Sequence, residues 1–283
     1  MPGQLFIVAT PIGNLEDITP RALRVLREVD LIACEDTRHT GKLLNHFGIT
    51  TRTISYHEHN ERERAEEICG LLASGKSVAV VSDAGTPLVS DPGFRIVQAA
   101  IAQDISVVPI PGAAAFVTAL VVSGLPTDRF FFAGFLPARA NARRAKLSEL
   151  SDLRATLVFY EAPHRIAATL KDAHDVLGNR PAAIARELTK LHEEFARGTL
   201  ARLAEQFSAE QSTRGEIVLM ISGEPVKATR TGSPFEQLTN RIDELQREGL
   251  DSKEALKQAA RELGIKRAEA YRLMVDQKNR RNK

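Results

Sequence analysis

The sequence predicts an α/β protein with two sheets followed by a small helical tail. Three observations lead to this fold class. Up to residue 111, short apolar runs alternate with helical segments, which is typical of βαβ units and a largely parallel sheet. After residue 111, strand signals lie closer together and predict a second α/β domain with mixed strand directions. Beyond residue 234 only helical patterns remain.

In the first part, uninterrupted apolar runs predict strands at residues 5–9, 31–34, 52–55, 77–82 and 105–108. The segments between them predict helices at residues 20–29, 38–47, 61–74 and 92–103. Thr19-Pro20 and Asp91-Pro92 are helix start signals, because a capping residue precedes a proline at the first helical position. Gly75 is a stop signal.

The second part predicts helices and strands in a less regular order. The expected helices are residues 113–122, the basic segment 139–150, residues 164–177 closed by Gly178, and residues 200–207. The expected strands are residues 129–135, 155–160, 182–187, 194–199 and 216–221. We therefore expect one domain at residues 1–111 and a second at residues 112–223.

The polar stretch 223–234 is rich in Gly, Pro and Thr, so it predicts a linker, at residues 224–234. Residues 235–283 predict a small helical domain with helices at 235–247, 252–263 and 267–276. Asp251 has capping-box spacing, and the turn at 263–265 has the spacing of a helix-turn-helix motif. Any three-helix cap would give the same pattern, so nucleic-acid contact and a purely structural role are both open.

Three strand ends rich in Gly and Pro are the most informative segments: residues 7–14, 78–93 and 107–115. Open α/β sheets bind ligands at the carboxyl ends of their strands, where backbone groups are free. The three ends therefore predict one composite site for a small molecule. No Gly-x-Gly-x-x-Gly motif follows the first strand and no P-loop motif occurs, which argues against a dinucleotide fold or a nucleoside triphosphatase.

Two other strand exits carry charged side chains. At residues 35–39, Asp36 and Arg38 are placed to hold a polar ligand, although Asp36 or Thr37 capping the next helix explains the pattern equally well. Glu161, His164 and Arg165 crowd a strand-to-helix turn, which favours a site over a bare turn.

Charge and composition restrict the class of protein. The net charge is +2, but residues 139–146 and 278–283 hold cations without acids, which indicates phosphate contacts or solvated surface. His57 and His59 lack a companion pair with zinc spacing, so we predict no metal. No membrane span or signal pattern is visible, and Cys34 and Cys69 fit small buried apolar residues, so we expect a cytoplasmic protein.

Long motifs in a particular order now make the sequence recognisable. They occupy residues 8–22, 34–41, 82–93, 109–113, 158–165, 185–190 and 197–200. The chain closely resembles the ribosomal RNA small subunit methyltransferase I family of the tetrapyrrole methylase superfamily. The resemblance implies the tetrapyrrole methylase-like two-domain α/β fold, with S-adenosylmethionine bound between the domains of a homodimer. It also implies methylation of the ribose 2′-hydroxyl of a decoding-centre cytidine in 16S rRNA of the 30S subunit.

The resemblance also assigns residues to roles. The cofactor-binding positions it implies are Pro11, Asp83, Ala84, Gly85, Leu88, Ala114, Ala115, Glu161 and Leu188. Asp36, Arg38 and Glu161 form our catalytic hypothesis, in which they face the reacting ribose; Glu35 and His164 are alternative bases. The expected RNA contacts are Arg38, Arg139, Arg143, Arg144, Lys146 and Arg165.

Two rival functions belong to other classes. One is a methyltransferase acting on a corrin or porphyrin precursor, which the first two loops argue against because they lack the Gly-rich and Gly-Asp-Pro patterns of those enzymes. The other is a non-enzymatic RNA-binding factor in ribosome assembly with a vestigial cleft.

Overall fold

The computed structural model describes residues 3–209, 215–223, 234–247, 250–262, 265 and 270. The chain divides into two compact units, Met1–Glu224 and Pro225–Lys283. No helix in these described ranges has the length and hydropathy needed to cross a membrane. Cys34 and Cys69 are both buried free thiols, as small apolar residues would be.

The first sheet is entirely parallel, with the strand order β3-β2-β4-β1-β5. Its strands are β1 (Gln4–Val8), β2 (Leu31–Cys34), β3 (Thr53–Ser55), β4 (Val78–Val81) and β5 (Ser106–Ile110). Every residue of β2 and β4 is buried, because helices cover both faces of the sheet. The predicted strands and their direction are therefore confirmed.

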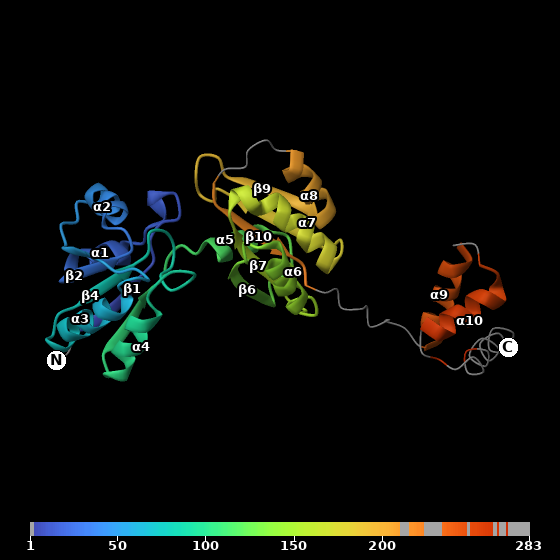
Figure 1. Cartoon of the computed structure of the whole chain (residues 1–283), viewed down its shortest axis with the longest axis horizontal. Helices are drawn as coiled ribbons and strands as arrows, with labels where there is room; N and C mark the ends of the chain where they lie inside the picture. The colour runs from blue at the N-terminus through green and yellow to red at the C-terminus, as the bar shows by residue number, and fades with distance from the viewer. Residues whose placement is uncertain are drawn as a thin grey trace. The chain divides into compact units, whose positions relative to one another are not determined.

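Four helices form the outer layers of this sheet (Figure 1). α1 (Pro20–Glu28) and α2 (Thr37–His46) bury their apolar residues against one face, and α3 (Glu61–Ala73) and α4 (Phe94–Ala102) against the other. Thr19 caps α1 as predicted, with its side chain accepting a hydrogen bond from the Ala22 N–H.

The predicted start of α4 at Asp91-Pro92 is wrong. The helix begins at Phe94, and its N-cap is Gly93, whose φ of 135° suits glycine. A Cβ at Gly93 would lie 2.8 Å from the Leu88 side chain, which would have to shift to admit it. Asp91 consequently stays in the loop and is free for another role.

The second sheet has the order β6-β7-β10-β8-β9, with β6 and β7 parallel and the other pairs antiparallel. Its strands are β6 (Phe130–Phe135), β7 (Thr156–Glu161), β8 (Pro181–Arg186), β9 (Glu194–Thr199) and β10 (Ile217–Ile221). α6 (Ala140–Glu149), α7 (Ile166–Leu177) and α8 (Leu200–Ala209) pack on one face, and α5 (Ala115–Val122) on the other. The mixed sheet was predicted.

The apolar cluster under α5 also contains Ile12, from the loop after β1, and Leu188, from the loop after β8. Burial of these side chains joins the first loop to the second sheet within one compact unit. A boundary between domains at residues 111 and 112 remains a proposal.

The second unit contains α9 (Pro234–Arg247) and α10 (Ser252–Glu262). Asp251 caps α10, because its Oδ1 accepts hydrogen bonds from the backbone N–H groups of Lys253 and Glu254 at 2.8 and 3.0 Å. Nearly all of the predicted linker (224–234) and, apart from Ala270, the predicted third helix (267–276) lie outside the described residues.

Candidate methyl-donor pocket

The three Gly/Pro-rich strand ends meet at one edge of the first sheet. Thr10 and Gly85 exchange backbone hydrogen bonds of 2.8 and 3.1 Å, which join the first loop to the second. The Thr86 hydroxyl donates to the Ala113 carbonyl at 3.0 Å, which joins the second loop to the third. The strands β4, β1 and β5 are neighbours in the sheet, so their carboxyl ends lie side by side as the sequence predicted.

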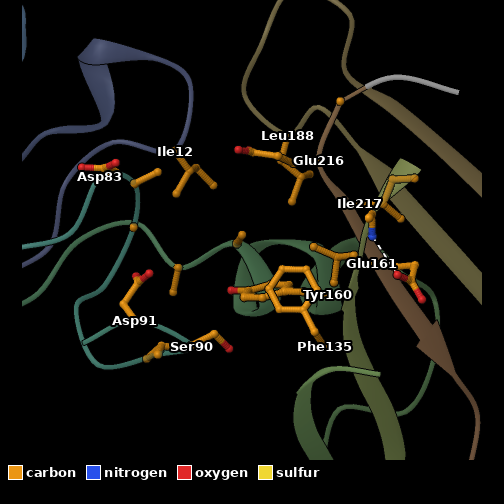
Figure 2. A pocket seen from close by; sticks show the side chains of 18 of the residues that line it. Ile12, Asp83, Ser90, Asp91, Phe135, Tyr160, Glu161, Leu188, Glu216 and Ile217 are labelled. Carbon is orange, nitrogen blue, oxygen red and sulfur yellow. Dashed lines mark hydrogen bonds between the residues drawn. The ribbon is translucent and has the colours of Figure 1, made fainter. Parts of the chain in front are cut away.

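A cavity of about 360 Å³ opens between these loops and the second sheet (Figure 2). Most of the cofactor positions implied by the family resemblance line it: Asp83, Ala84, Gly85, Ala114, Ala115, Glu161 and Leu188. Two do not. Pro11 lines a neighbouring cavity, and Leu88 packs beneath Gly93. The volume is in the range of pockets that hold a cofactor-sized molecule.

Backbone strain is concentrated around this cavity. Leu88 and Ser90 in the second loop have φ values of 71° and 64°, and Glu187 and Thr189 beside Leu188 have values of 52° and 64°. Residues other than glycine adopt this region at a cost, and such positions collect at functional sites. The two loops are therefore held in shapes that local preference alone would not select.

Asp91 is a pocket residue that the sequence did not single out. It lines the cavity together with Ser90 on the second loop, opposite Tyr160 of β7 (Figure 2). Burial, reinforced by the nearby charges of Glu35 and Asp83, raises the pKa of Asp91 to about 6. Burial also raises the pKa of Tyr160, and the Asp91 charge adds to that shift.

The hypothesis that the Glu161 carboxylate faces the reacting group is wrong. Its side chain is 0% exposed and points away from the Tyr160 ring (Figure 2). The carboxylate accepts hydrogen bonds from the Thr169 hydroxyl at 2.6 Å and the Ala162 N–H at 2.8 Å, and pairs with Arg165 at 3.1 Å. Glu161 thus fixes the turn after β7, and Arg165, which also donates to the Leu136 carbonyl, is engaged with it.

Asp36 is the N-cap of α2, the alternative that the sequence left open. Its Oδ1 accepts from the Arg38 N–H at 2.8 Å, and its Oδ2 pairs with the Arg38 guanidinium at 2.9 Å. These hydrogen bonds lower the pKa of Asp36 to about 2, so its carboxylate is a weak proton acceptor at neutral pH. Neither residue lines the donor cavity, and the Arg38 side chain is 88% exposed.

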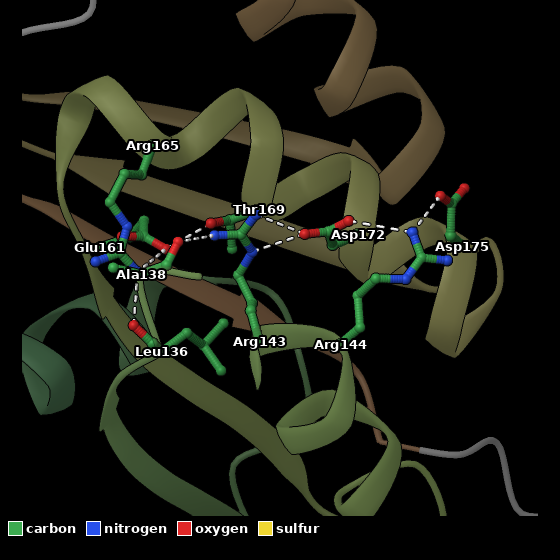
Figure 3. A network of polar contacts seen from close by, with 9 residues as sticks. All are labelled: Leu136, Ala138, Arg143, Arg144, Glu161, Arg165, Thr169, Asp172 and Asp175. Atoms are coloured by element: carbon green, nitrogen blue, oxygen red, sulfur yellow. Dashed lines mark hydrogen bonds and ion pairs between the residues drawn. The ribbon is translucent and has the colours of Figure 1, made fainter. Parts of the chain in front are cut away.

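The basic segment on α6 divides into buried and exposed cations (Figure 3). Arg143 is only 4% exposed and pairs with Asp172 of α7 at 2.6 Å, so its assignment as an RNA contact is wrong. Arg144 pairs with Asp172 and Asp175 but remains 45% exposed. Lys146 pairs with Glu149 at 2.9 Å, also at the surface. Arg139, at the N-cap of α6, is exposed.

The described residues contain no group of three or more His, Cys, Asp or Glu side chains that could hold a metal ion. His57 and His59 lie with their ring centroids 5.9 Å apart in an edge contact.

Fold and pocket together define a methylase of the tetrapyrrole class. The family model for Tetrapyrrole (Corrin/Porphyrin) Methylases matches residues 4–204. Among solved structures, uroporphyrin-III-C-methyltransferase from Thermus thermophilus is similar, with a TM-score of 0.56 and 21% identity over 78% of this chain and 94% of that one. A cobalt precorrin-4 methyltransferase gives a TM-score of 0.55 with 15% identity, over 77% of this chain and 94% of that one. At these identities the likeness shows the fold alone.

Curated relatives narrow the class. The chain is 48% identical to ribosomal RNA small subunit methyltransferase I of Halalkalibacterium halodurans, over 96% of this chain and 94% of the relative. It is 48% identical to the protein of that name from Synechocystis, over 97% of this chain and 98% of the relative. In Pseudomonas aeruginosa the identity is 52%, over 78% of this chain and 79% of the relative. The chain belongs to the ribosomal RNA small subunit methyltransferase I family.

Proposed function

We propose that this protein transfers a methyl group from S-adenosylmethionine to the ribose 2′-hydroxyl of a cytidine in the decoding centre of 16S rRNA, in the cytoplasm. The observation that carries the proposal is the cavity at the carboxyl ends of β1, β4 and β5, closed by loops of the second sheet. The names of the close relatives support small-subunit rRNA as the substrate.

The lining of the cavity fits S-adenosylmethionine. One part of the lining consists of the small residues Gly85, Ala114 and Ala115, which leave room for the flat adenine base. Carboxylates of Asp83, Asp91 and Glu216 line the same cavity and favour a positively charged ligand. When bound, S-adenosylmethionine supplies a methyl group already activated by its sulfonium charge. A structure of a Thermus thermophilus uroporphyrin-III C-methyltransferase, 19% identical, contains S-adenosyl homocysteine.

The chain's own contribution is to position a hydroxyl and to accept its proton. Asp91 is the proton acceptor in this proposal, because its pKa of about 6 lies near the working pH and it lines the donor cavity. Asp36 and Arg38 lie at the N-terminus of α2. There the Asp36 carboxylate holds the exposed guanidinium of Arg38, which contacts RNA phosphates in this proposal. Arg139, Arg144 and Lys146 supply further phosphate contacts at the surface.

The test is methyl transfer from labelled S-adenosylmethionine to small ribosomal subunits, followed by mapping of the modified nucleotide. We expect label on a single ribose of 16S rRNA, stable to alkali because a 2′-O-methyl group blocks strand cleavage. Label on a porphyrin precursor without RNA would instead support the first rival function. Binding of RNA with no transfer, unaffected by Asp83→Ala, would support the second.

We also propose a homodimer. Exposed apolar side chains gather on α5 and on the edge strand β6: Val117, Val121, Val122, Phe130, Phe131 and Phe135. Phe116 of α5 contacts the rings of Phe130 and Phe132, so the two elements adjoin. Monomeric proteins rarely expose an apolar patch of this kind.

Sedimentation of the wild-type protein is expected to give twice the mass of one chain. Val121, whose relative exposure is 67%, can be changed without disturbing the core. We expect Val121→Asp to yield monomers with an unchanged circular dichroism spectrum, because a charge in the interface must be desolvated. Arg24→Asp, on the exposed side of α1, is the control and should leave the mass unchanged.

A further inference from the structure

A second cavity, of about 260 Å³, lies on the other side of the first loop. It is lined by Pro11 and Gly13 of that loop, by His39 and Lys42 of α2, and by Asp83 at the end of β4. Ile12, between Pro11 and Gly13, instead lines the donor cavity. The first loop is therefore a partition, with alternate residues facing the two spaces.

Asp83 lines both cavities, so the two spaces adjoin at this side chain. The Asp83 carboxylate is held in place there, because its Oδ1 accepts a hydrogen bond from the Asp36 N–H at 3.2 Å. A group-transfer enzyme must bring two reactants together at one point. The donor cavity has the volume for one reactant of cofactor size, and the neighbouring cavity offers a place for the other.

The charges around the second cavity differ from those around the first. His39 and Lys42 are both exposed on α2; His39 directly follows Arg38, and Lys42 lies one turn after it. Within the part of the chain that the structure describes, no carboxylate pairs with His39 or Lys42. Lysine near a cavity mouth binds phosphate as a point charge. The apolar side chains of Leu15 and Leu43 also line the cavity and provide a surface for a base or sugar.

We propose that the second cavity holds the target nucleotide of the RNA, with a flanking phosphate on His39 and Lys42. Its ribose 2′-hydroxyl would reach past Asp83 into the donor cavity, which Asp91 also lines. This inference rests on the proposed function and names the place where its substrate binds. The nucleotide must be exposed or swung out of its stack to enter, as in other enzymes that modify nucleotides within a folded RNA.

The first test is Lys42→Glu, measured by equilibrium binding of small ribosomal subunits without any methyl donor. We expect affinity to fall at least about tenfold and the slope of log K against log salt to decrease by about one, as for a lost phosphate contact. The affinity for S-adenosylmethionine, measured by calorimetry, should not change. The matched control is Lys171→Glu, the same charge change on an exposed residue of α7 that lines neither cavity.

Leu15→Trp tests the cavity without changing charge, since the larger side chain fills the space between the first loop and α2. We expect it to raise the KM for small subunits and to leave donor binding intact. Equal losses of RNA affinity in Lys42→Glu and Lys171→Glu would overturn the proposal, as would weaker donor binding in Leu15→Trp. Because the binding assays need no methyl transfer, they separate this proposal from the proposed reaction.

Discussion

Asp91→Asn is expected to lower kcat for methyl transfer by about 10²- to 10⁴-fold, the usual contribution of a general base. The amide keeps the shape of the side chain but cannot accept the hydroxyl proton. Asp91 lines the donor cavity together with Asp83. Burial, with the nearby charges of Glu35 and Asp83, raises the pKa of Asp91 to about 6. The affinity for S-adenosylmethionine should fall much less, because Asp83 and Glu216 still line the cavity.

The same proposal predicts a pH profile. The base works only when deprotonated, so kcat/KM should fall tenfold per unit below about pH 6 and level off above it. The titratable groups that interact electrostatically with Asp91 are Glu35, Asp83 and Tyr160. Burial also raises the pKa values of Glu35 and Tyr160. In Asp91→Asn the acid limb should disappear from the residual activity. Asp152→Asn, on the surface, is the control for loss of one carboxylate.

Asp91 also links activity to stability. A carboxyl group whose pKa is higher in the folded state than in the unfolded chain favours folding when protonated. This contribution is complete below the unfolded pKa of 3.8 and is lost as the pH rises through about 6. We therefore expect Asp91→Asn to raise the melting temperature at pH 8 while it lowers activity. A variant that loses stability and activity together would argue that Asp91 is a structural residue.

The sequence predicted the strands, the order of the helices and the three converging loops, because these depend on local apolar patterns and on Gly and Pro. It failed at Asp91, since Asp-Pro is locally a sound helix start. The actual start depends on Gly93, which adopts a positive φ over Leu88 and donates its N–H to the Glu61 carboxylate of α3, a tertiary contact. The elevated pKa of Asp91 depends first on burial of its carboxyl group in the folded protein, and then on the charges of Asp83 and of Glu35, which is distant in the sequence.

Two other errors were avoidable by periodicity. Along β7, the side chains of Leu157, Phe159 and Glu161 alternate with those of Val158 and Tyr160. Leu157 and Phe159 pack against the helices on one face of the sheet. Glu161 therefore points towards the helices, and Tyr160 towards the cavity.

Arg143 is the other error that periodicity could have prevented. It is four residues before Leu147 and seven before Leu150, which are both buried in the core under α6. This spacing places the arginine on the buried face of the helix, so the run of cations does not form one surface patch.

The burial of Arg143 leads to the second large effect. Arg143→Met is expected to lower the free energy of unfolding by about 3–5 kcal/mol. The reason is that the buried Asp172 carboxylate then keeps only its ion pair with Arg144, which is 45% exposed. In the native protein the guanidinium donates through Nε to Asp172 at 2.8 Å and through an NH group to the Ala138 carbonyl at 3.1 Å (Figure 3). Urea denaturation measures the change.

The control is Arg144→Met on the same helix. Its side chain is 45% exposed, so loss of its ion pairs should lower the free energy of unfolding by no more than about 1 kcal/mol. The double variant Arg143→Met/Asp172→Leu should recover much of the loss from Arg143→Met, since no buried charge is then left unpaired. Affinity for small ribosomal subunits at a temperature where all variants are folded should fall for Arg144→Met and not for Arg143→Met. The opposite pattern, with stability unchanged and RNA affinity lost in Arg143→Met, would return Arg143 to the RNA-binding surface.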